Sequence, residues 1–225
     1  MSKNYIIAID GPSASGKSTL AKAISKKLGI TYIDTGAMYR ACAVYFLNNN
    51  IEINEENAIK FVNELNINIK YENESMKVYL NNIDVSERIR ENEVSMGASN
   101  ISKYKCIRDK MVYQQRKMGE VSSVVLDGRD IGTVVFRNAD LKIFLTASTK
   151  VRALRRKKEL EAKGNVINLE ELEQELINRD IQDTTRKESP LKKADDAIEV
   201  DTSSLTIEET TSIVIDLLKE RVEIA

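Results

Sequence analysis

Histidine is absent from this chain of 225 residues, and cysteine occurs only twice, at Cys42 and Cys106. Without histidine there is no Ser-His triad, no imidazole metal ligand and no imidazole acid-base catalysis. The two cysteines lie far apart and form no C-x-x-C pair, so the sequence predicts neither a zinc site nor a disulfide framework. The chemistry has to come from carboxylates, arginine, lysine and hydroxyl groups.

The chain has no excess of charge of one sign, because it contains 34 Lys and Arg residues and 35 Asp and Glu residues. This balance gives no global basic field for nucleic acid or an acidic membrane. No run of 18 apolar residues occurs, and the apolar stretch near the N-terminus covers only residues 5–9. We therefore expect no membrane span, no cleaved signal and a cytoplasmic location. The length predicts one domain, or a core domain that carries an insertion.

Short apolar runs that are typical of buried strands alternate with helical patterns along the chain. The runs cover residues 4–10, 30–34, 122–128, 140–147 and 196–203. Helical patterns cover residues 17–29, 35–50, 54–65, roughly 91–118, 148–163, 169–182 and 206–222. This alternation predicts an α/β fold with a parallel sheet covered by helices on both faces.

One stretch, residues 67–86, follows the two-residue period of half-exposed strands instead. Its alternating apolar residues are Ile67, Ile69, Tyr71, Met76, Val78 and Leu80. Asn73-Glu74 and Asn81-Asn82 are predicted to be the turns between strands. We interpret the stretch as a small antiparallel β insert of two or three strands.

The motif G-x-x-x-x-G-K-[ST] occurs between the first predicted strand and the first predicted helix. Glycines allow the backbone N–H groups to surround phosphates, Lys17 reaches the β- and γ-phosphates, and the Ser18 hydroxyl coordinates Mg²⁺. The following helix directs its positive end at the same charge. The alternative, a Gly/Ser-rich turn without a ligand, fits this strand-loop-helix context less well. The predicted nucleotide-binding residues are Gly11, Pro12, Ser13, Ala14, Ser15, Gly16, Lys17, Ser18 and Thr19.

Asp127 stands at the end of the buried run 122–128. A carboxylate at the carboxyl end of a parallel strand lies where the Mg²⁺ side of a nucleotide site requires one. Aspartates that end strands are also common turn formers, so Asp127 alone is a weak signal. Together with the phosphate loop, it favours a nucleotide site.

Three classes of nucleotide-binding protein compete for this phosphate loop. A GTPase switch would carry an Asn-Lys-x-Asp string and a transporter ATPase a Ser-Gly-Gly signature, and the sequence has neither. A small-molecule kinase needs clustered arginines for a second phosphate and a basic lid, because arginine forks bind phosphate oxygens in pairs. The candidate arginines are Arg40, Arg129, Arg152, Arg155, Arg156, Arg179 and Arg186.

Arg152, Arg155 and Arg156 have the i, i+3, i+4 spacing that places side chains on one helix face. Each arginine taken singly is more typical of a solvated surface. The basic stretch 150–158 could also bind nucleic acid, but the neutral net charge and the lack of interleaved aromatic residues argue against this. We therefore favour the kinase.

The chain resembles the bacterial cytidylate kinase family from about residue 5 to 220. The resemblance rests on the strings IDGPSASGKST, DTGAMYR, DGRDIGTVVF, KIFLTAS, RALRRKKEL with a following KG, and RDIQDTTRKESPL. The first and third strings together are specific, because DGRDIGTVVF is not expected in adenylate or guanylate kinases. The insert at 67–86 agrees with the small three-stranded insert of this family. Thr35 stands where relatives can carry Ser and keeps the hydroxyl.

The resemblance implies a single P-loop kinase unit over residues 1–225, with a small antiparallel β insert and a helical lid. Its core would cover about 1–34, 120–147 and 190–225. A monophosphate-binding region would cover about 35–119, with the insert at 66–88. The lid would cover about 148–189. Monomers are expected.

The implied reaction transfers the γ-phosphoryl group of ATP to CMP or dCMP with Mg²⁺, giving ADP and CDP or dCDP. The implied catalytic residues are Lys17, Asp127, Arg129, Arg155 and Arg156, and Arg152 would belong to the lid over the donor. Thr35 is among the implied substrate-binding residues. Arg40 and Arg129 would hold the acceptor phosphate, Ser99, Arg108 and Asp130 would read cytosine, and Arg179 and Asp183 would contact the ribose. Arg186 would contact either base or phosphate. The alternatives left open are a kinase for UMP or a non-nucleotide alcohol, and a nucleotide-dependent regulatory switch.

Overall fold

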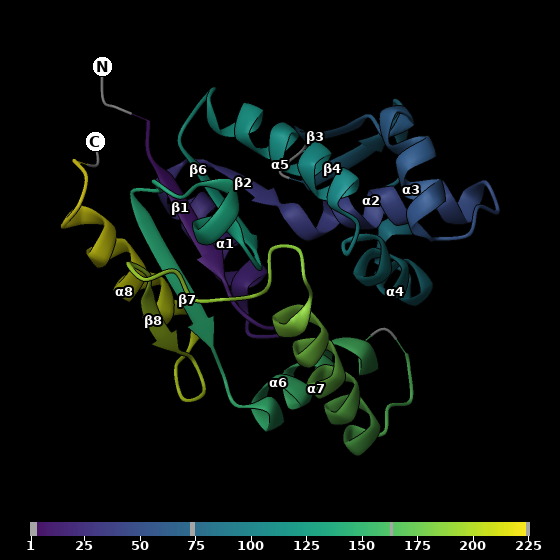
Figure 1. Cartoon of the computed structure of the whole chain (residues 1–225). Helices are drawn as coiled ribbons and strands as arrows, with labels where there is room; N and C mark the ends of the chain where they lie inside the picture. Colours follow the sequence, from purple (N-terminus) through teal and green to yellow (C-terminus); the bar gives the residue numbers. More distant parts are fainter. Residues whose placement is uncertain (1–3, 73–74, 163, 224–225) are drawn as a thin grey trace. The chain divides into compact units, whose positions relative to one another are not determined.

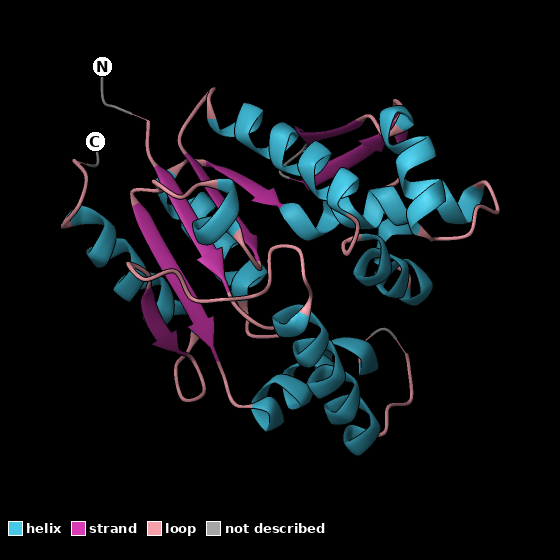
Figure 2. Ribbon diagram, in the orientation of Figure 1, coloured by secondary structure: helices cyan, strands magenta, loops and turns pink. Residues whose placement is uncertain are grey.

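The computed structural model describes residues 4–72, 75–162 and 164–223. Contacts divide the chain into two compact units. We name Met1–Tyr32 with Val121–Ala225 the sheet unit, and Ile33–Glu120 the helical unit. Figure 1 colours the chain from the N- to the C-terminus, and Figure 2 separates its helices from its strands. Within the described ranges, none of the helices combines the length and the apolar character that crossing a membrane requires.

The sheet unit is built on a five-stranded sheet. In sheet order the strands are β2 (Thr31–Asp34, whose last two residues are counted with the helical unit), β6 (Val124–Gly128), β1 (Ile6–Asp10), β7 (Leu141–Thr146) and β8 (Ile198–Asp201). The central strand β1 pairs in parallel with β6 and β7, and β7 pairs in parallel with β8. Because both faces of such strands are buried, they read as continuous apolar runs in the sequence. The predicted parallel sheet is confirmed.

Helices flank this sheet (Figures 1 and 2). α1 (Lys17–Leu28) packs against β1, β6 and α8 (Ile207–Lys219), and it buries Leu20, Ala21 and Ile24 at helical spacing. α6 (Thr149–Glu161) and α7 (Leu169–Thr185) pack against each other. A single π-helical turn, η3 (Ile131–Val135), follows β6 and contacts β1.

The helical unit surrounds α2 (Thr35–Asn48), whose buried residues occupy most of its length. A helix that is apolar on all sides is expected to be buried. α2 packs against α4 (Asn92–Ile101) and α5 (Lys105–Gly119). The remaining helical segments are α3 (Glu55–Phe61), η1 (Val62–Glu64) and η2 (Arg88–Arg90).

The antiparallel insert predicted for the helical unit is confirmed as a three-stranded sheet. Its strands are β3 (Ile67–Glu72), β4 (Ser75–Leu80) and β5 (Ile83–Asp84). Asn81 and Asn82 both have positive φ, 50° and 67°, as the two-residue turn of a β-hairpin requires. The other predicted turn, Asn73-Glu74, lies outside the described residues, as does the side chain of Tyr71.

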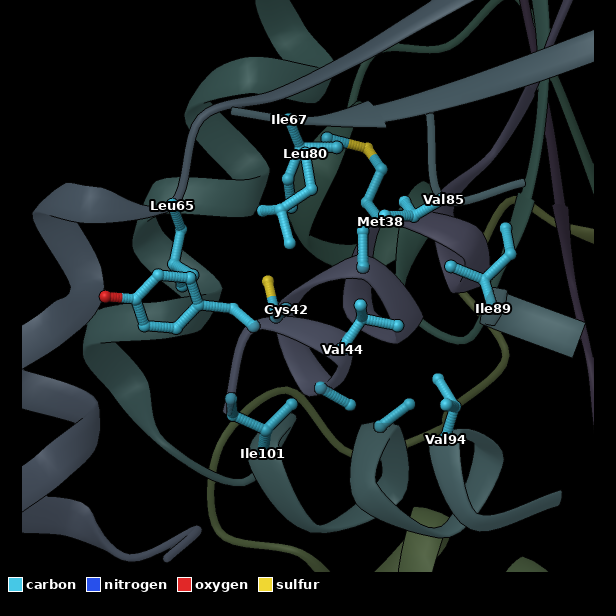
Figure 3. Close-up of a cluster of buried hydrophobic side chains, with 14 of the residues drawn as sticks. Met38, Cys42, Val44, Leu65, Ile67, Leu80, Val85, Ile89, Val94 and Ile101 are labelled. Carbon is cyan, nitrogen blue, oxygen red and sulfur yellow. The ribbon is translucent and has the colours of Figure 1, made fainter. Parts of the chain in front are cut away.

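The insert shares the hydrophobic core of the helical unit. Val78 is fully buried, and Ile67 and Leu80 expose 6% or less of their surface. Figure 3 shows Ile67 and Leu80 beside Met38 and Cys42 of α2. The alternating apolar residues of the insert therefore pack on α2 rather than on a separate core.

Candidate active site

The phosphate loop, residues 11–18, connects the carboxyl end of β1 to the start of α1. Gly16 precedes the helix in a left-handed conformation, and no side chain of the described residues caps this N-terminus. The first turn of a helix has N–H groups without intrahelical partners, and these groups bind anions. The loop is therefore suited to the phosphates of a nucleotide.

Gly11 is required by the close approach of the phosphate loop to β7. Its φ is +152°, and a Cβ atom at this position would lie 2.1 Å from the carbonyl oxygen of Leu145. Any side chain would displace either the loop or the neighbouring strand. The first glycine of the motif is thus set by packing against the sheet as well as by ligand access.

Lys17 lies in the first turn of α1 and exposes 5% of its surface. Its Nζ donates to the Pro12 carbonyl over 2.5 Å and to the Ser15 hydroxyl over 3.3 Å. Burial lowers the pKa of Lys17 well below its ordinary value, and the Arg129 guanidinium lowers it further, against the opposing effect of Asp127. A negatively charged phosphate would reverse this effect and favour the ammonium form.

Ser18 and Asp127, predicted from separate parts of the sequence, are in contact. The Ser18 hydroxyl donates to Asp127 Oδ2 over 2.8 Å, and the Tyr32 hydroxyl donates to Oδ1 over 2.7 Å. Asp127 is buried at the end of β6, opposite Ile9 of β1. One carboxylate and one hydroxyl are the oxygen donors that suit Mg²⁺, which keeps several waters and binds substrate phosphates in its remaining positions. The residues present therefore fit the ion.

Four of the predicted substrate residues form a network of alternating charge in the sheet unit. Arg129 Nε donates to Asp183 Oδ2 over 2.7 Å, and Arg186 lies 3.6 Å from Asp183 and 3.9 Å from Asp130. Burial alone would raise the pKa of Asp183, but Arg129, with Arg179 and Arg186, holds it below its ordinary value. The network presents charged donors and acceptors with limited exposure, as recognition of a polar ligand requires.

The three arginines of α6 differ in their surroundings. Arg152 is buried, donates to the Ser13 carbonyl over 3.1 Å and forms a 2.7 Å ion pair with Asp180 of α7. Arg155 donates to the carbonyl of Thr202 over 2.6 Å. Arg152 and Arg155 also lie beside the phosphate loop, since Arg155 approaches the carbonyl of Ser15 at 3.5 Å.

Arg156 is the more exposed member of this group. It pairs with Glu159 one turn further along α6, at 3.0 Å, and 35% of its side chain is exposed. A long side chain in a solvated pair of this kind can change partner at little cost. Arg156 is therefore the α6 arginine whose present contact is easiest to exchange for a ligand.

The helical unit carries the other predicted substrate residues. Thr35 is the buried first residue of α2, and Arg40, one turn later, pairs with Asp34 at 2.8 Å. Asp34 also accepts from the backbone N–H of Ala37. The same carboxylate therefore caps α2 and orients Arg40.

Arg108 and Ser99 belong to neighbouring helices of the same unit. Arg108 exposes 3% of its surface, donates to the Ser102 carbonyl over 3.1 Å and lies 5.3 Å from the centre of the Tyr39 ring. The Ser102 hydroxyl in turn donates to the carbonyl of Ser99 over 2.9 Å. Arg108 is thus held by a carbonyl and an aromatic face.

Sequence reasoning missed four polar residues that hold these groups: Asp10, Tyr32, Tyr39 and Thr202. Asp10 carried a usable signal, because it ends a buried strand as Asp127 does. The others give no comparable signal, since tyrosine is ordinary in an apolar strand or helix and threonine is ordinary just after a strand.

The fold and the site together define a class. A parallel α/β sheet whose central strand ends in a phosphate loop, with clustered arginines in the same unit, is the arrangement of a P-loop phosphotransferase. The sequence model of the cytidylate kinase family matches residues 7–220, so the chain belongs to the cytidylate kinase family.

Curated relatives agree with this assignment, and a solved structure agrees with the fold. The cytidylate kinase of Fusobacterium nucleatum is 49% identical over 224 residues, which cover 98% of each chain. The cytidylate kinase of Alkaliphilus oremlandii is 49% identical over 213 residues, 95% of this chain and 97% of that protein. The crystal structure of an uncharacterized protein from Eubacterium ventriosum covers 97% of this chain with a TM-score of 0.55 at 13% identity, which supports the fold alone.

Proposed function

We propose that the chain transfers the γ-phosphoryl group of ATP to CMP or dCMP and releases ADP with CDP or dCDP. Membership of the cytidylate kinase family over residues 7–220 carries this proposal. The phosphate loop supports the donor half of the reaction, and the charged network around Asp183 supports an acceptor that is both anionic and polar.

The donor phosphates would bind the loop residues 11–19 and the N-terminus of α1. The Lys17 side chain is suited to the β- and γ-phosphates because its Nζ already donates to the Pro12 carbonyl and the Ser15 hydroxyl of the loop. Arg152 supports the loop through the Ser13 carbonyl, while Arg155 and Arg156 would neutralise charge on the transferring group.

Ser18 and Asp127 would hold Mg²⁺, which we propose as the cofactor. When bound, the ion would neutralise charge on the phosphate oxygens and orient them. The Tyr32 hydroxyl, which donates to the other oxygen of Asp127, fixes the orientation of this carboxylate. No residue of the site has to form a covalent intermediate.

The acceptor would be recognised by charge and by hydrogen bonds. Arg40 and Arg129 are suited to its phosphate, and Thr35 supplies a hydroxyl at the start of the helix that carries Arg40. We assign Arg179 and Asp183 to the ribose, and Ser99, Arg108 and Asp130 to cytosine, with Arg186 next to Asp130 and Asp183. Asp130 only accepts and Arg108 only donates, which matches the 4-amino group and the acceptor edge of cytosine.

Catalysis would then consist of positioning and charge stabilisation. An oxygen of the acceptor phosphate forms a bond to the γ-phosphorus while the bond to the β,γ-bridging oxygen breaks, and ADP leaves with that electron pair. Lys17, Arg155 and Arg156 stabilise the charge on the transferring group, while Arg40 and Arg129 align the acceptor. Residues 148–189 act as the lid, and the chain acts as a monomer in the cytoplasm.

A coupled assay of ADP release with CMP, dCMP, UMP, AMP and GMP tests this function. We expect CMP and dCMP to be preferred over UMP on the order of a thousandfold, the scale that hydrogen-bond recognition can supply. A Lys17→Ala preparation purified in parallel controls for contaminating kinases. A preference for UMP, for a non-nucleotide alcohol, or ADP release without an acceptor would refute the proposal.

A further inference from the structure

Asp10 is a buried carboxylate that the reaction as described does not use. It is the last residue of β1 and exposes 5% of its surface. Its Oδ1 accepts from the backbone N–H of Ile131 and its Oδ2 from that of Gly132, both over 2.8 Å. These two N–H groups belong to the first two residues of the π-helical turn Ile131–Val135. A carboxylate is the side chain that can accept from both at once.

Lys142 of β7 holds the same segment from its other end. Its buried ammonium donates to the carbonyl of Arg137, just beyond the turn, and forms a 2.8 Å ion pair with Asp196. A Cβ atom at Gly132 would lie 3.1 Å from Lys142 Cδ and 3.4 Å from Asp10 Oδ2. Gly132 is therefore enclosed by both side chains, and the turn has little freedom to move.

Asp130 directly precedes the clamped turn. The carbonyl of Asp130 accepts from the N–H groups of Val134 and Val135, over 2.9 and 3.2 Å, so the backbone of Asp130 is part of the turn. Its carboxylate is buried and lies 3.9 Å from Arg186. A shift of the turn would thus move the Asp130 carboxylate directly.

We propose that Asp10 is a positioning residue for base specificity: by accepting both N–H groups of the π turn, it fixes the Asp130 carboxylate in the orientation that selects cytosine over uracil. This inference rests on the proposed function. In this proposal Asp10 acts through the orientation of Asp130.

The surroundings of Asp10 act on its charge in opposite directions. Burial raises the pKa of Asp10 to about 7, the N–H groups of Gly132 and Ile131 oppose the rise, and nearby Asp130 adds to it. Lys17 also faces this carboxylate and opposes the rise. An amide in place of the carboxylate would keep the size and lose one acceptor, which makes Asp10→Asn the informative change.

The test is kcat/KM for CMP and UMP at saturating ATP in the wild type, Asp10→Asn, Asp130→Ala and the double variant. We expect Asp10→Asn to lower the CMP/UMP ratio about tenfold or more, because one charged hydrogen bond to the turn is replaced by a donor facing a donor. The ratio is unaffected by the fraction of active enzyme. In the Asp130→Ala background, Asp10→Asn should lower the ratio no further, as expected for two residues acting through one contact.

Thr210→Val is the matched control, since Thr210 is a buried polar residue of the same unit whose hydroxyl donates to the Thr206 carbonyl over 2.8 Å. It should leave the CMP/UMP ratio unchanged. Gly132→Ala is a second test of the turn, because its Cβ would press on Lys142 and Asp10 without altering either. It should lower the ratio as Asp10→Asn does, and it decides the matter if Asp10→Asn does not fold.

Two failures can be told apart. A wild type that does not prefer CMP contradicts the proposed function. The positioning role alone is contradicted if the wild type prefers CMP and Asp10→Asn or Gly132→Ala lowers kcat/KM for CMP and UMP by the same factor.

Discussion

The hydroxyl of Ser18 donates a 2.8 Å hydrogen bond to the carboxylate of Asp127, and this bond joins the first turn of α1 to the end of β6. The two residues are 109 positions apart in the sequence. Their contact brings together the hydroxyl of the phosphate loop and the one carboxylate predicted for the Mg²⁺ side. Two oxygen donors from two elements of one sheet unit are thus available for the ion.

Removing either donor should weaken the response to Mg²⁺. We expect Ser18→Ala and Asp127→Asn to raise the Mg²⁺ concentration for half-maximal rate by about tenfold or more. Ser25→Ala is the matched control on the same helix, where the hydroxyl donates to the Ile30 carbonyl. A Mg²⁺ titration of CDP formation measures the effect. Equal Mg²⁺ concentrations for half-maximal rate in Ser18→Ala and Ser25→Ala would contradict the assignment of Ser18 to the Mg²⁺ site.

Lys17 should take up a proton when ATP binds. Its pKa is lowered by burial, and the negative triphosphate would raise it again, so any net proton transfer at Lys17 on binding is an uptake. Calorimetry of ATP binding near pH 8 in two buffers of different ionisation enthalpy measures the uptake. Lys17→Ala should abolish the uptake and reduce transfer by about a thousandfold while the circular dichroism stays native. Proton release, or the same uptake in Lys17→Ala, would be inconsistent with this role.

Replacing Arg155 and replacing Arg156 should have similar effects on turnover but different effects on the stability of the protein. Arg155→Ala and Arg156→Ala should each lower kcat far more than CMP affinity, since their contacts form chiefly in the transition state. Arg156→Ala should change the free energy of unfolding by less than about 1 kcal/mol, because it loses only an exposed pair. Arg155→Ala should lower the free energy of unfolding by roughly 1–3 kcal/mol, because its hydrogen bonds to Thr202 are lost.

Steady-state kinetics, CMP binding and urea unfolding of both variants supply the comparison. A loss of CMP affinity with kcat intact would show that these arginines belong to the acceptor rather than to the lid.

The insert should contribute to the stability of the helical unit through one face only. Ile67→Ala should lower the free energy of unfolding by about 2–5 kcal/mol, because Ile67 is 3% exposed in the core beside α2. Ile83→Ala is the matched control in the same small sheet, since Ile83 is 68% exposed, and it should change stability by less than about 0.5 kcal/mol. Equal losses in urea unfolding would argue against a shared core.

The sequence predicted the strands and most helices because their signals are local. The apolar runs at 4–10 and 122–128 became β1 and β6, and the two-residue period at 67–86 became the small antiparallel sheet. The π turn Ile131–Val135 was not predicted, since Ile-Gly-Thr-Val-Val favours a strand by composition. Its conformation depends on Asp10, which is 121 residues away from Ile131.

The arginines of α6 show a similar limit for the site. Their spacing predicts one helix face, yet the side chain of Arg152 is 5% exposed and that of Arg156 35%. The difference comes from Ser13 and Asp180, which lie on other elements and give no signal near residue 152. The phosphate loop could be predicted from the sequence because the residues that would bind the phosphates are consecutive. The residues proposed to bind the acceptor nucleotide are scattered along the chain.

The claim that Asp130 reads the cytosine amino group is tested most directly by kcat/KM for CMP and UMP in the wild type and Asp130→Ala. Loss of a charged hydrogen bond predicts a fall for CMP of about a hundredfold or more. UMP should change little or improve, because the carboxylate that opposes its O4 lone pairs is gone. The CMP/UMP ratio should therefore collapse. A fall by the same factor for both substrates would show that Asp130 acts on phosphate, metal or structure, and would contradict this account of base recognition.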